Sequence, residues 1–171
     1  MKLLVISAFV LIWSAAAAVA DTSPTDDNAA PSGTPRMAAD FSERDITGVH
    51  TIHLNSYRGK VILLNFWGPW CQPCRTEVPA LERVQDEYKG RLVVIGAAVF
   101  SSDQAVELFY KDFAINYPVI YGSYDLMEKY GRVSAFPTTI VIDQKGDIVG
   151  TLVGSRTRDQ FEEILKPLLA D

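Results

Sequence analysis

The sequence of 171 residues is poor in the side chains that bind metal ions, with only two cysteines, two histidines and three methionines. Two cysteines are too few for a four-ligand zinc site, and both lie in the stretch Cys71-Gln72-Pro73-Cys74. A pair that bonds only to its near neighbour cannot join distant parts of a fold. His50 and His53 lie three apart in a strand-like segment, so they point to opposite faces and do not share a metal. We therefore predict that the cysteine pair serves chemistry, with no metal and no cofactor.

Long basic runs are also missing. The chain has 16 lysines and arginines against 21 aspartates and glutamates, which gives a net charge of −5. No patch is basic enough to neutralise a phosphate backbone, so nucleic acid is not an expected partner. The length and the 48% content of hydrophobic residues suit one ordinary core. We expect a single folded domain and a monomer.

The first twenty residues have the pattern of a signal peptide. Lys2 precedes the apolar run 3–12, and the segment ends in Ala18-Val19-Ala20, a small-residue cleavage site. We predict export to the periplasm with cleavage after Ala20; the alternative is an uncleaved membrane anchor, because 3–20 is just long enough to span. In an oxidising compartment a close pair of thiols becomes oxidised unless a partner reduces it.

The rest of the chain divides into a linker and one domain. Residues 21–37 contain three prolines and almost no bulky apolar side chain, which predicts a flexible linker, and the domain is expected at 38–171. An N-terminal β-hairpin is predicted at 41–54. Strands that alternate with helices then indicate an α/β fold with a mainly parallel sheet covered on both faces, closed by an antiparallel hairpin and a final helix. The expected strands are 61–66, 92–99, 117–121, 138–143 and 148–154, and the expected helices are 71–88, 102–113, 124–130 and 157–169.

The cysteine spacing places both thiols on the first turn of a helix. Residues i and i+3 of a helix lie roughly 5–6 Å apart on one side, which is within the range that a disulfide requires. Cys71 lies at the helix N-terminus, where free amide protons and the helix dipole favour a thiolate, so it is the predicted attacking cysteine. Cys74 lies one turn further on and should be more shielded. Its predicted role is to attack the mixed disulfide and release the product.

These residues resemble those of a known fold. The motif Phe66-Trp67-x-x-Trp70-Cys71-x-Pro73-Cys74, followed by Pro79 and by Phe136-Pro137-Thr138-Thr139, is similar to that of thioredoxin-fold proteins over roughly 40–170. Within them the chain resembles the exported TlpA/ResA-like group. That resemblance implies a central mixed sheet flanked by helices, an N-terminal β-hairpin, and an inserted strand and helix between residues 91 and 113.

The resemblance also assigns a substrate side to the site. It implies that Pro137 is a cis-proline facing the disulfide and that Phe136 offers its backbone to an extended substrate segment. Trp70, Gln72 and Pro73 surround the cysteines and are candidate substrate contacts. The alternative for Trp70 is packing at the rim of the site.

Glu77 is the predicted residue that tunes the thiols. Ordinary thioredoxins carry a buried aspartate where this chain has Asn65, and an amide cannot exchange a proton at neutral pH. Glu77 lies one turn beyond Cys74, and a buried carboxylate there would keep the thiols protonated through like charge, which favours a reducing character. The alternative is a solvated glutamate paired with Arg75 or Arg83.

The expected function is that of an exported thiol–disulfide oxidoreductase. We predict a reductant of specific protein disulfides, such as those of apocytochrome c or a copper-oxidase assembly protein, with electrons supplied by a membrane dithiol carrier. Thioredoxins of the CcmG type for cytochrome c maturation commonly carry Pro-Glu-Thr where this chain has Pro137-Thr138-Thr139, which weakens that narrower assignment. The alternatives are an oxidant and, from another class, a Cu(I)-handling module. The Thr-x-x-Cys arrangement of peroxiredoxins is absent.

Overall fold

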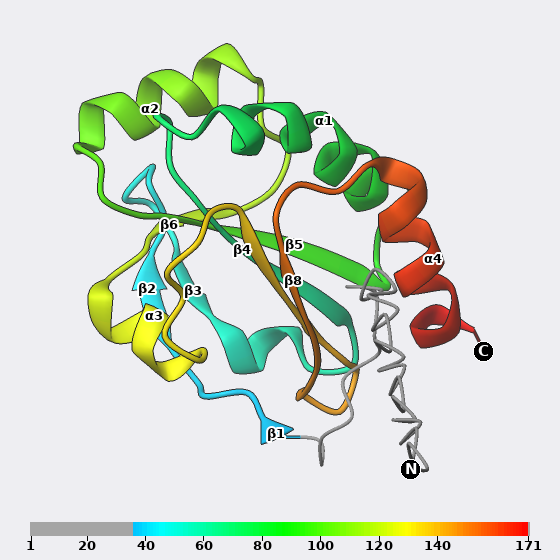
Figure 1. The fold of residues 1–171 in the computed structure, drawn as a ribbon. Helices are drawn as coiled ribbons and strands as arrows, with labels where there is room; N and C mark the ends of the chain where they lie inside the picture. Colours follow the sequence, from blue (N-terminus) through cyan, green and yellow to red (C-terminus); the bar gives the residue numbers. More distant parts are fainter. Residues whose placement is uncertain (1–35, 171) are drawn as a thin grey trace, which may run out of the picture.

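The computed structural model describes residues 36–170, which form a sheet with helices on both faces (Figure 1). The predicted signal peptide and most of the predicted linker lie outside the described residues. The elements in chain order are β1 (Arg36–Met37), β2 (Ser42–Arg44), β3 (Thr51–His53), the 3-10 turn η1 (Leu54–Tyr57), β4 (Val61–Trp67), α1 (Gln72–Glu87), β5 (Leu92–Ala98), α2 (Asp103–Asp112), β6 (Val119–Tyr121), α3 (Tyr124–Lys129), β7 (Thr138–Ile142), β8 (Asp147–Val153) and α4 (Arg158–Leu169).

The main sheet has six strands in the order β1-β8-β7-β4-β5-β6. Strand β4 is central: it runs parallel to β5 on one side and antiparallel to β7 on the other. Every residue of β4 is buried, as its continuous apolar sequence predicts for a strand that is covered on both faces. The mixed sheet flanked by helices that the resemblance implies is confirmed, and the segment 91–113 forms β5 and α2 as expected. The expectation of a mainly parallel sheet is wrong: β4–β5 and β5–β6 are parallel, whereas β1–β8, β7–β8 and β4–β7 are antiparallel.

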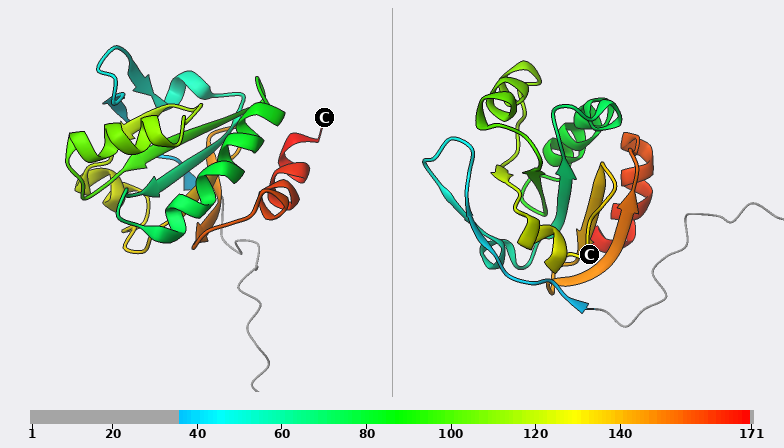
Figure 2. Two further views of the ribbon diagram at one scale, coloured as in Figure 1. Left: turned by 90° about the horizontal axis from the view of Figure 1, so that it is seen from above. Right: turned by 60° about the vertical axis from the view of Figure 1, so that its left-hand side comes forward.

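Two layers of apolar side chains cover the sheet, because successive residues of β4 point to opposite faces. Val61, Leu63 and Trp67 face the layer that α1, α2 and α4 cover. Ile62, Leu64 and Phe66 face the opposite layer, which α3 and the N-terminal segment close. Figure 2 shows α1 and α4 together on one side of the sheet. Strand β4 therefore carries the residues just before the cysteines into the centre of the molecule.

The predicted N-terminal hairpin is present. β2 and β3 pair antiparallel around the turn, where the Asp45 N–H donates to the His50 carbonyl over 2.9 Å. They form a small sheet of their own, which is attached to the main sheet where the Ile46 N–H donates to the Val119 carbonyl over 2.9 Å. Within residues 36–170, no helix is both long and apolar enough to cross a bilayer.

The boundary of the predicted linker is wrong at its last two residues. Arg36 and Met37 form β1, which pairs with Ile148 and Asp147 of β8. Main-chain hydrogen bonds to the free edge of β8 order this segment, and a composition of prolines and small residues does not reveal such bonds. The folded domain therefore includes residues 36 and 37 as well as the predicted start at Ala38.

Candidate active site

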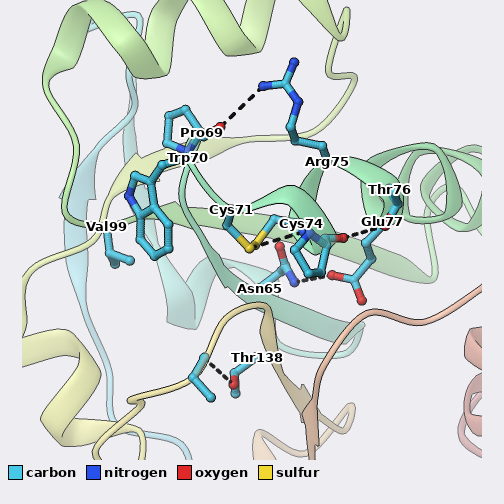
Figure 3. Close-up of a disulfide and its surroundings, with 12 residues drawn as sticks. Asn65, Pro69, Trp70, Cys71, Cys74, Arg75, Thr76, Glu77, Val99 and Thr138 are labelled. Carbon is cyan, nitrogen blue, oxygen red and sulfur yellow. Dashed lines mark hydrogen bonds between the residues drawn. A yellow bond between two sulfur atoms is a disulfide. The ribbon is translucent and has the colours of Figure 1, made fainter.

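The two cysteines lie where β4 ends and α1 begins, and they form a disulfide (Figure 3). The Cα atoms of Cys71 and Cys74 are 5.3 Å apart, within the range expected from the helical spacing. Cys71 is the N-cap of α1, and its Sγ accepts the N–H of Cys74 over 3.2 Å. Pro73 stands in the first helical turn, where a missing amide proton costs little.

Exposure does not distinguish the two cysteines, which are both buried: the exposed fraction is 4% for Cys71 and 2% for Cys74. The predicted difference in shielding is therefore small in the oxidised protein. The distinction lies in the backbone: the Cys71 sulfur stands at the helix N-terminus and accepts an amide proton, which favours a thiolate there. This supports Cys71 as the attacking residue.

The turn before the cysteines is built tightly. The Cys71 N–H donates to the Gly68 carbonyl over 3.0 Å. A Cβ at Gly68 would lie 2.6 Å from the ring of Trp70, so only glycine fits beneath this indole. Gln72 and Pro73 are exposed on the first turn of α1.

Glu77 is buried in this site, with only 1% of its surface exposed. Its Oε2 accepts from Asn65 Nδ2 and its Oε1 accepts from the backbone N–H of Arg156, each over 2.9 Å. Burial raises the pKa of Glu77 to about 7, although both hydrogen bonds oppose the rise. The alternative of a solvated glutamate paired with Arg75 or Arg83 is therefore wrong. Glu77 can exchange a proton at neutral pH, one helical turn beyond Cys74.

Asn65 connects Glu77 to the sheet. Its Nδ2 also donates to Thr139 Oγ1 over 2.9 Å, and the two residues face each other across β4 and β7. Figure 3 shows Asn65 between the disulfide and the Glu77 carboxylate. Since an amide is neutral, the ionisable group of this buried network is Glu77.

Arg75 is half-buried, and in the described part of the chain no acidic side chain forms an ion pair with it. Its guanidinium stacks over the rings of Phe109 and Phe113, with centroid distances of 5.1 and 5.0 Å, and its Nη1 donates to the Pro69 carbonyl over 3.3 Å. The side chain thus ties α1 to α2. It also ties α1 to the turn that precedes Cys71, where Figure 3 shows its bond to Pro69.

The Phe136–Pro137 peptide bond is cis, as the resemblance predicts. Thr138, the next residue, pairs with Phe66 near the end of β4, so Pro137 stands at the same edge of the sheet as the cysteine turn. The Pro137 carbonyl accepts the N–H of Gly154 over 2.8 Å. The contact of Pro137 and Phe136 with a substrate stays a prediction.

Three aromatic rings form a surface beside the disulfide, which we call the aromatic surface: Trp70, Phe100 and Phe136. Trp70 and Phe100 are 55% and 63% exposed. Both pack edge-on against Phe136, at centroid distances of 5.7 and 6.0 Å, and Trp70 Nε1 donates to the Phe100 carbonyl over 3.2 Å. Exposed apolar groups that meet in this way are typical of a binding surface.

Sequence reasoning missed Phe100. Its backbone has φ of 50°, a conformation that bulky residues rarely adopt and that marks functional loops when it persists. The available signal was a large aromatic residue between the end of a buried strand and Ser102, the N-cap of the next helix. Among residues 36–170, no three His, Cys, Asp or Glu side chains converge as metal ligands would.

Comparison with known proteins finds relatives over most of the chain. The model of the AhpC/TSA family matches residues 35–151. The Thioredoxin-like protein YneN of Bacillus subtilis (strain 168) is 35% identical over 133 residues, which are 76% of this chain and 77% of that protein. The Thiol-disulfide oxidoreductase ResA of Bacillus anthracis is 34% identical over 135 residues, 78% of this chain and 77% of that protein.

Solved structures resemble the whole domain. A thioredoxin-family thiol:disulfide interchange protein from Chlorobium tepidum TLS superposes with a TM-score of 0.75 at 30% identity, covering 82% of this chain and all of the other. A DsbF homologue from Corynebacterium diphtheriae gives a TM-score of 0.76 at 27% identity, covering 85% of this chain and 96% of the other.

Proposed function

Because the chain belongs to the AhpC/TSA family of thioredoxin-like proteins and is a thiol–disulfide oxidoreductase of the ResA type, we propose that it acts as an exported reductant of specific protein disulfides. The observation that carries the proposal is the buried Glu77, one helical turn beyond Cys74 in a site whose strand supplies the neutral Asn65. The dithiol of reduced Cys71 and Cys74 carries the two electrons and becomes the disulfide when it gives them up, so the reaction needs no further cofactor.

The reaction is a pair of thiol–disulfide exchanges. The Cys71 thiolate of the reduced protein attacks one sulfur of the substrate disulfide; a mixed disulfide forms and the other substrate sulfur leaves and takes up a proton. The Cys74 thiolate then attacks Cys71 Sγ and displaces the second substrate thiolate, which is protonated in turn. The substrate gains two electrons and two protons, and the protein is left with its own disulfide. A membrane dithiol carrier then reduces it.

Glu77 gives this cycle its direction. An ionised carboxylate close to the two sulfurs disfavours further negative charge there, so the reduced protein keeps its thiols protonated and is not stabilised as a thiolate. A reduced form without that stabilisation gives up its electrons more readily. Since the pKa of Glu77 is raised to about 7, the carboxyl can also accept a proton from Cys74 when that sulfur must attack.

The aromatic surface and Pro137 support a protein substrate. An extended segment that carries the target cysteine would lie beside Pro137, whose lack of an N–H leaves its neighbours free to pair with a guest strand. Trp70, Phe100 and Phe136 would hold an apolar side chain of that segment. Apocytochrome c and a copper-oxidase assembly protein remain the candidate substrates. The protein would work in the periplasm, as a monomer.

Trapping tests the proposal. In the native host, Cys74→Ser leaves the mixed disulfide without its resolving thiol, so we expect adducts that link Cys71 to partner proteins and disappear on reduction. Cys71→Ser is the matched control and should accumulate none, because it removes the attacking thiol. Mass spectrometry of the adducts names the substrate and the donor.

The direction is checked on the purified protein by equilibration with glutathione. A reductant should have a potential well below that of the strong periplasmic oxidants, which lie at about −120 mV. A potential near theirs would favour the oxidant alternative, and a lack of adducts through Cys71 would contradict the exchange mechanism.

A further inference from the structure

We propose that Arg156 is a positioning residue of this site: its guanidinium holds the loop between β8 and α4 in the shape that presents one backbone N–H to Glu77 and another to Pro137. Neither the cysteine motif nor the roles of Glu77 and Pro137 involve this side chain. It acts on the reaction through the backbone that it shapes, without touching the reacting sulfurs.

The guanidinium folds back onto its own loop. Arg156 Nη1 donates to three successive carbonyls, those of Val153 and Gly154 over 3.1 Å and that of Ser155 over 3.3 Å. Gathering three carbonyls around one cation curls the chain, and Gly154 adopts the left-handed conformation, with φ of +83°, that this curl requires. The loop therefore takes its shape from Arg156.

The curled loop reaches the site at two points. The N–H of Arg156 donates to Glu77 Oε1 over 2.9 Å, and the N–H of Gly154 donates to the Pro137 carbonyl over 2.8 Å. The two donors stand only two positions apart in the chain. One short segment thus sets a hydrogen bond of the proton-carrying residue and a hydrogen bond of the cis-proline on the substrate side.

Within the described residues, side chains of α1 hydrogen-bond to this loop at two points: the Arg156 N–H and the loop's end, where Arg158 Nη2 donates to both carboxylate oxygens of Glu87 over 2.7 Å. Apart from these bonds, a cleft of about 300 Å³ lies between the loop and α1. In the part of the chain that the structure describes, an added Cβ at Gly154 would meet one atom within 4 Å beyond its chain neighbours, Arg156 Nη1 at 3.7 Å. Arg83 of α1 and Arg156 of the loop both line this cleft. Without the guanidinium, the loop loses the contacts that set its curl, and the cleft leaves space into which it can shift.

Glu77 should report such a movement. Both of its partners, Asn65 Nδ2 and the Arg156 N–H, can only donate, so they favour the ionised carboxylate and hold the pKa of Glu77 below the value that burial alone would give. Loss of the Arg156 N–H therefore lets Glu77 keep its proton to higher pH. The other groups that face it are the Arg156 guanidinium and the buried Tyr117 hydroxyl, whose pKa is raised by burial and by the nearby carboxylates of Glu82 and Glu77.

The test titrates Glu77 in the oxidised protein, where no thiol is present. In protein labelled with 13C-glutamate, NMR follows the carboxyl resonances with pH, and the Glu77 signal is identified by its loss in Glu77→Gln. In Arg156→Met the midpoint should rise by about one to two pH units, the equivalent of one hydrogen bond to a charged group. Arg83→Met, which removes an exposed arginine of the same cleft, should leave the midpoint unchanged.

Arg156→Lys separates shape from charge, and it serves alone if Arg156→Met does not fold. An ammonium keeps the positive charge but cannot reproduce the planar guanidinium, so its midpoint should lie above that of the wild type. A wild-type midpoint in Arg156→Lys would mean that charge alone explains the site, and a wild-type midpoint in Arg156→Met would mean that the side chain has no effect on Glu77. Either result would overturn the positioning of Glu77.

The second half concerns Pro137 and rests on the proposed function. At a pH where Glu77 is ionised in every variant, KM for a disulfide-containing peptide should rise severalfold in Arg156→Lys, with kcat little changed, because the loop no longer fixes the Pro137 carbonyl. An unchanged KM would overturn this half. A wild-type protein inactive on every disulfide would defeat the proposed function, while the Glu77 titration would still decide the role of Arg156.

Discussion

At the scale of single residues, the buried carboxyl of Glu77 links the chemistry of the site to the stability of the protein. Its pKa rises from 4.5 to about 7 in the folded state, because burial penalises the charged form. Between these values the unfolded chain has released the proton and the folded protein still holds it. A rise in pH therefore lowers the free energy of unfolding, and the loss is complete above pH 7.

Glu77→Gln should remove this pH dependence. One proton shifted from 4.5 to about 7 corresponds to about 3 kcal/mol, so the wild type should lose about that much more stability than the variant between these pH values. Urea denaturation of the oxidised proteins across the range measures both curves. The glutamine amide has one acceptor oxygen where the carboxylate has two, so its NH2 faces either Asn65 Nδ2 or the Arg156 N–H, donor against donor. The two slopes are therefore compared and not the absolute stabilities. Parallel curves would show that Glu77 titrates normally.

The residues of the site were predictable only where the chemistry lies in the side chain. Cys71, Cys74 and Pro137 stand in a motif, and Glu77 follows from the helical spacing and from Asn65. Phe100 follows the end of β5, and its carbonyl accepts from Trp70 Nε1 next to the cysteines. Arg156 contributes to the site through its backbone N–H. A main-chain donor is present at almost every position, so no residue type in the sequence marks the one that matters.

At the scale of elements, Arg75 connects two helices and a turn. Its guanidinium stacks on Phe109 and Phe113 of α2 while it holds the Pro69 carbonyl at the entrance to α1. Removal of the Arg75 guanidinium would eliminate two cation–π contacts and one hydrogen bond from a charged group. The stability of the helix pair and the order of the cysteine turn thus depend on one side chain.

Arg75→Ala should lower the free energy of unfolding by about 1–3 kcal/mol, measured by urea denaturation of the oxidised protein at neutral pH. Arg83→Ala is the control on the same helix, at an exposed position, and should change stability by less than about 0.5 kcal/mol. Equal losses in the two variants would mean that the stacked geometry contributes nothing beyond an ordinary surface arginine.

Periodicity predicted the helices and the long strands to within a few residues. N-cap residues such as Ser102 and Thr157 mark the starts of α2 and α4, because their hydroxyls accept the first free N–H groups. The short β1 was not predictable in this way. Two residues have no period, and their order comes from the edge of β8, a partner distant in the sequence.

At the scale of the whole molecule, the N-terminal segment holds the second core layer in place. Ala38 is buried and its N–H donates to the Gly146 carbonyl over 2.9 Å, while the Ala39 carbonyl accepts the hydroxyl of Tyr130 over 2.6 Å. These contacts join the edge of the main sheet to the end of α3. The segment is thus part of the fold.

A chain shortened to begin at Asp40 should be less stable, by about 2–4 kcal/mol, than one shortened to begin at Arg36. It loses the pairing of β1 with β8 and leaves the buried Tyr130 hydroxyl without its acceptor. Thermal and urea unfolding of the two shortened chains measure the difference. Equal stabilities would mean that β1 and Ala38 contribute nothing to the fold.

The disulfide joins residues only three positions apart, so it closes a very short loop in the unfolded chain. Such a loop costs little chain entropy, and the bond therefore adds little to stability by restricting the unfolded state. Oxidation and unfolding then form a closed thermodynamic cycle. The difference in unfolding free energy between oxidised and reduced protein therefore equals the free energy by which folding shifts the equilibrium between dithiol and disulfide, relative to the unfolded chain. If the oxidised form is the more stable, folding favours the disulfide and makes the dithiol a stronger reductant than it is in the unfolded chain. Two unfolding curves measure this effect without any substrate.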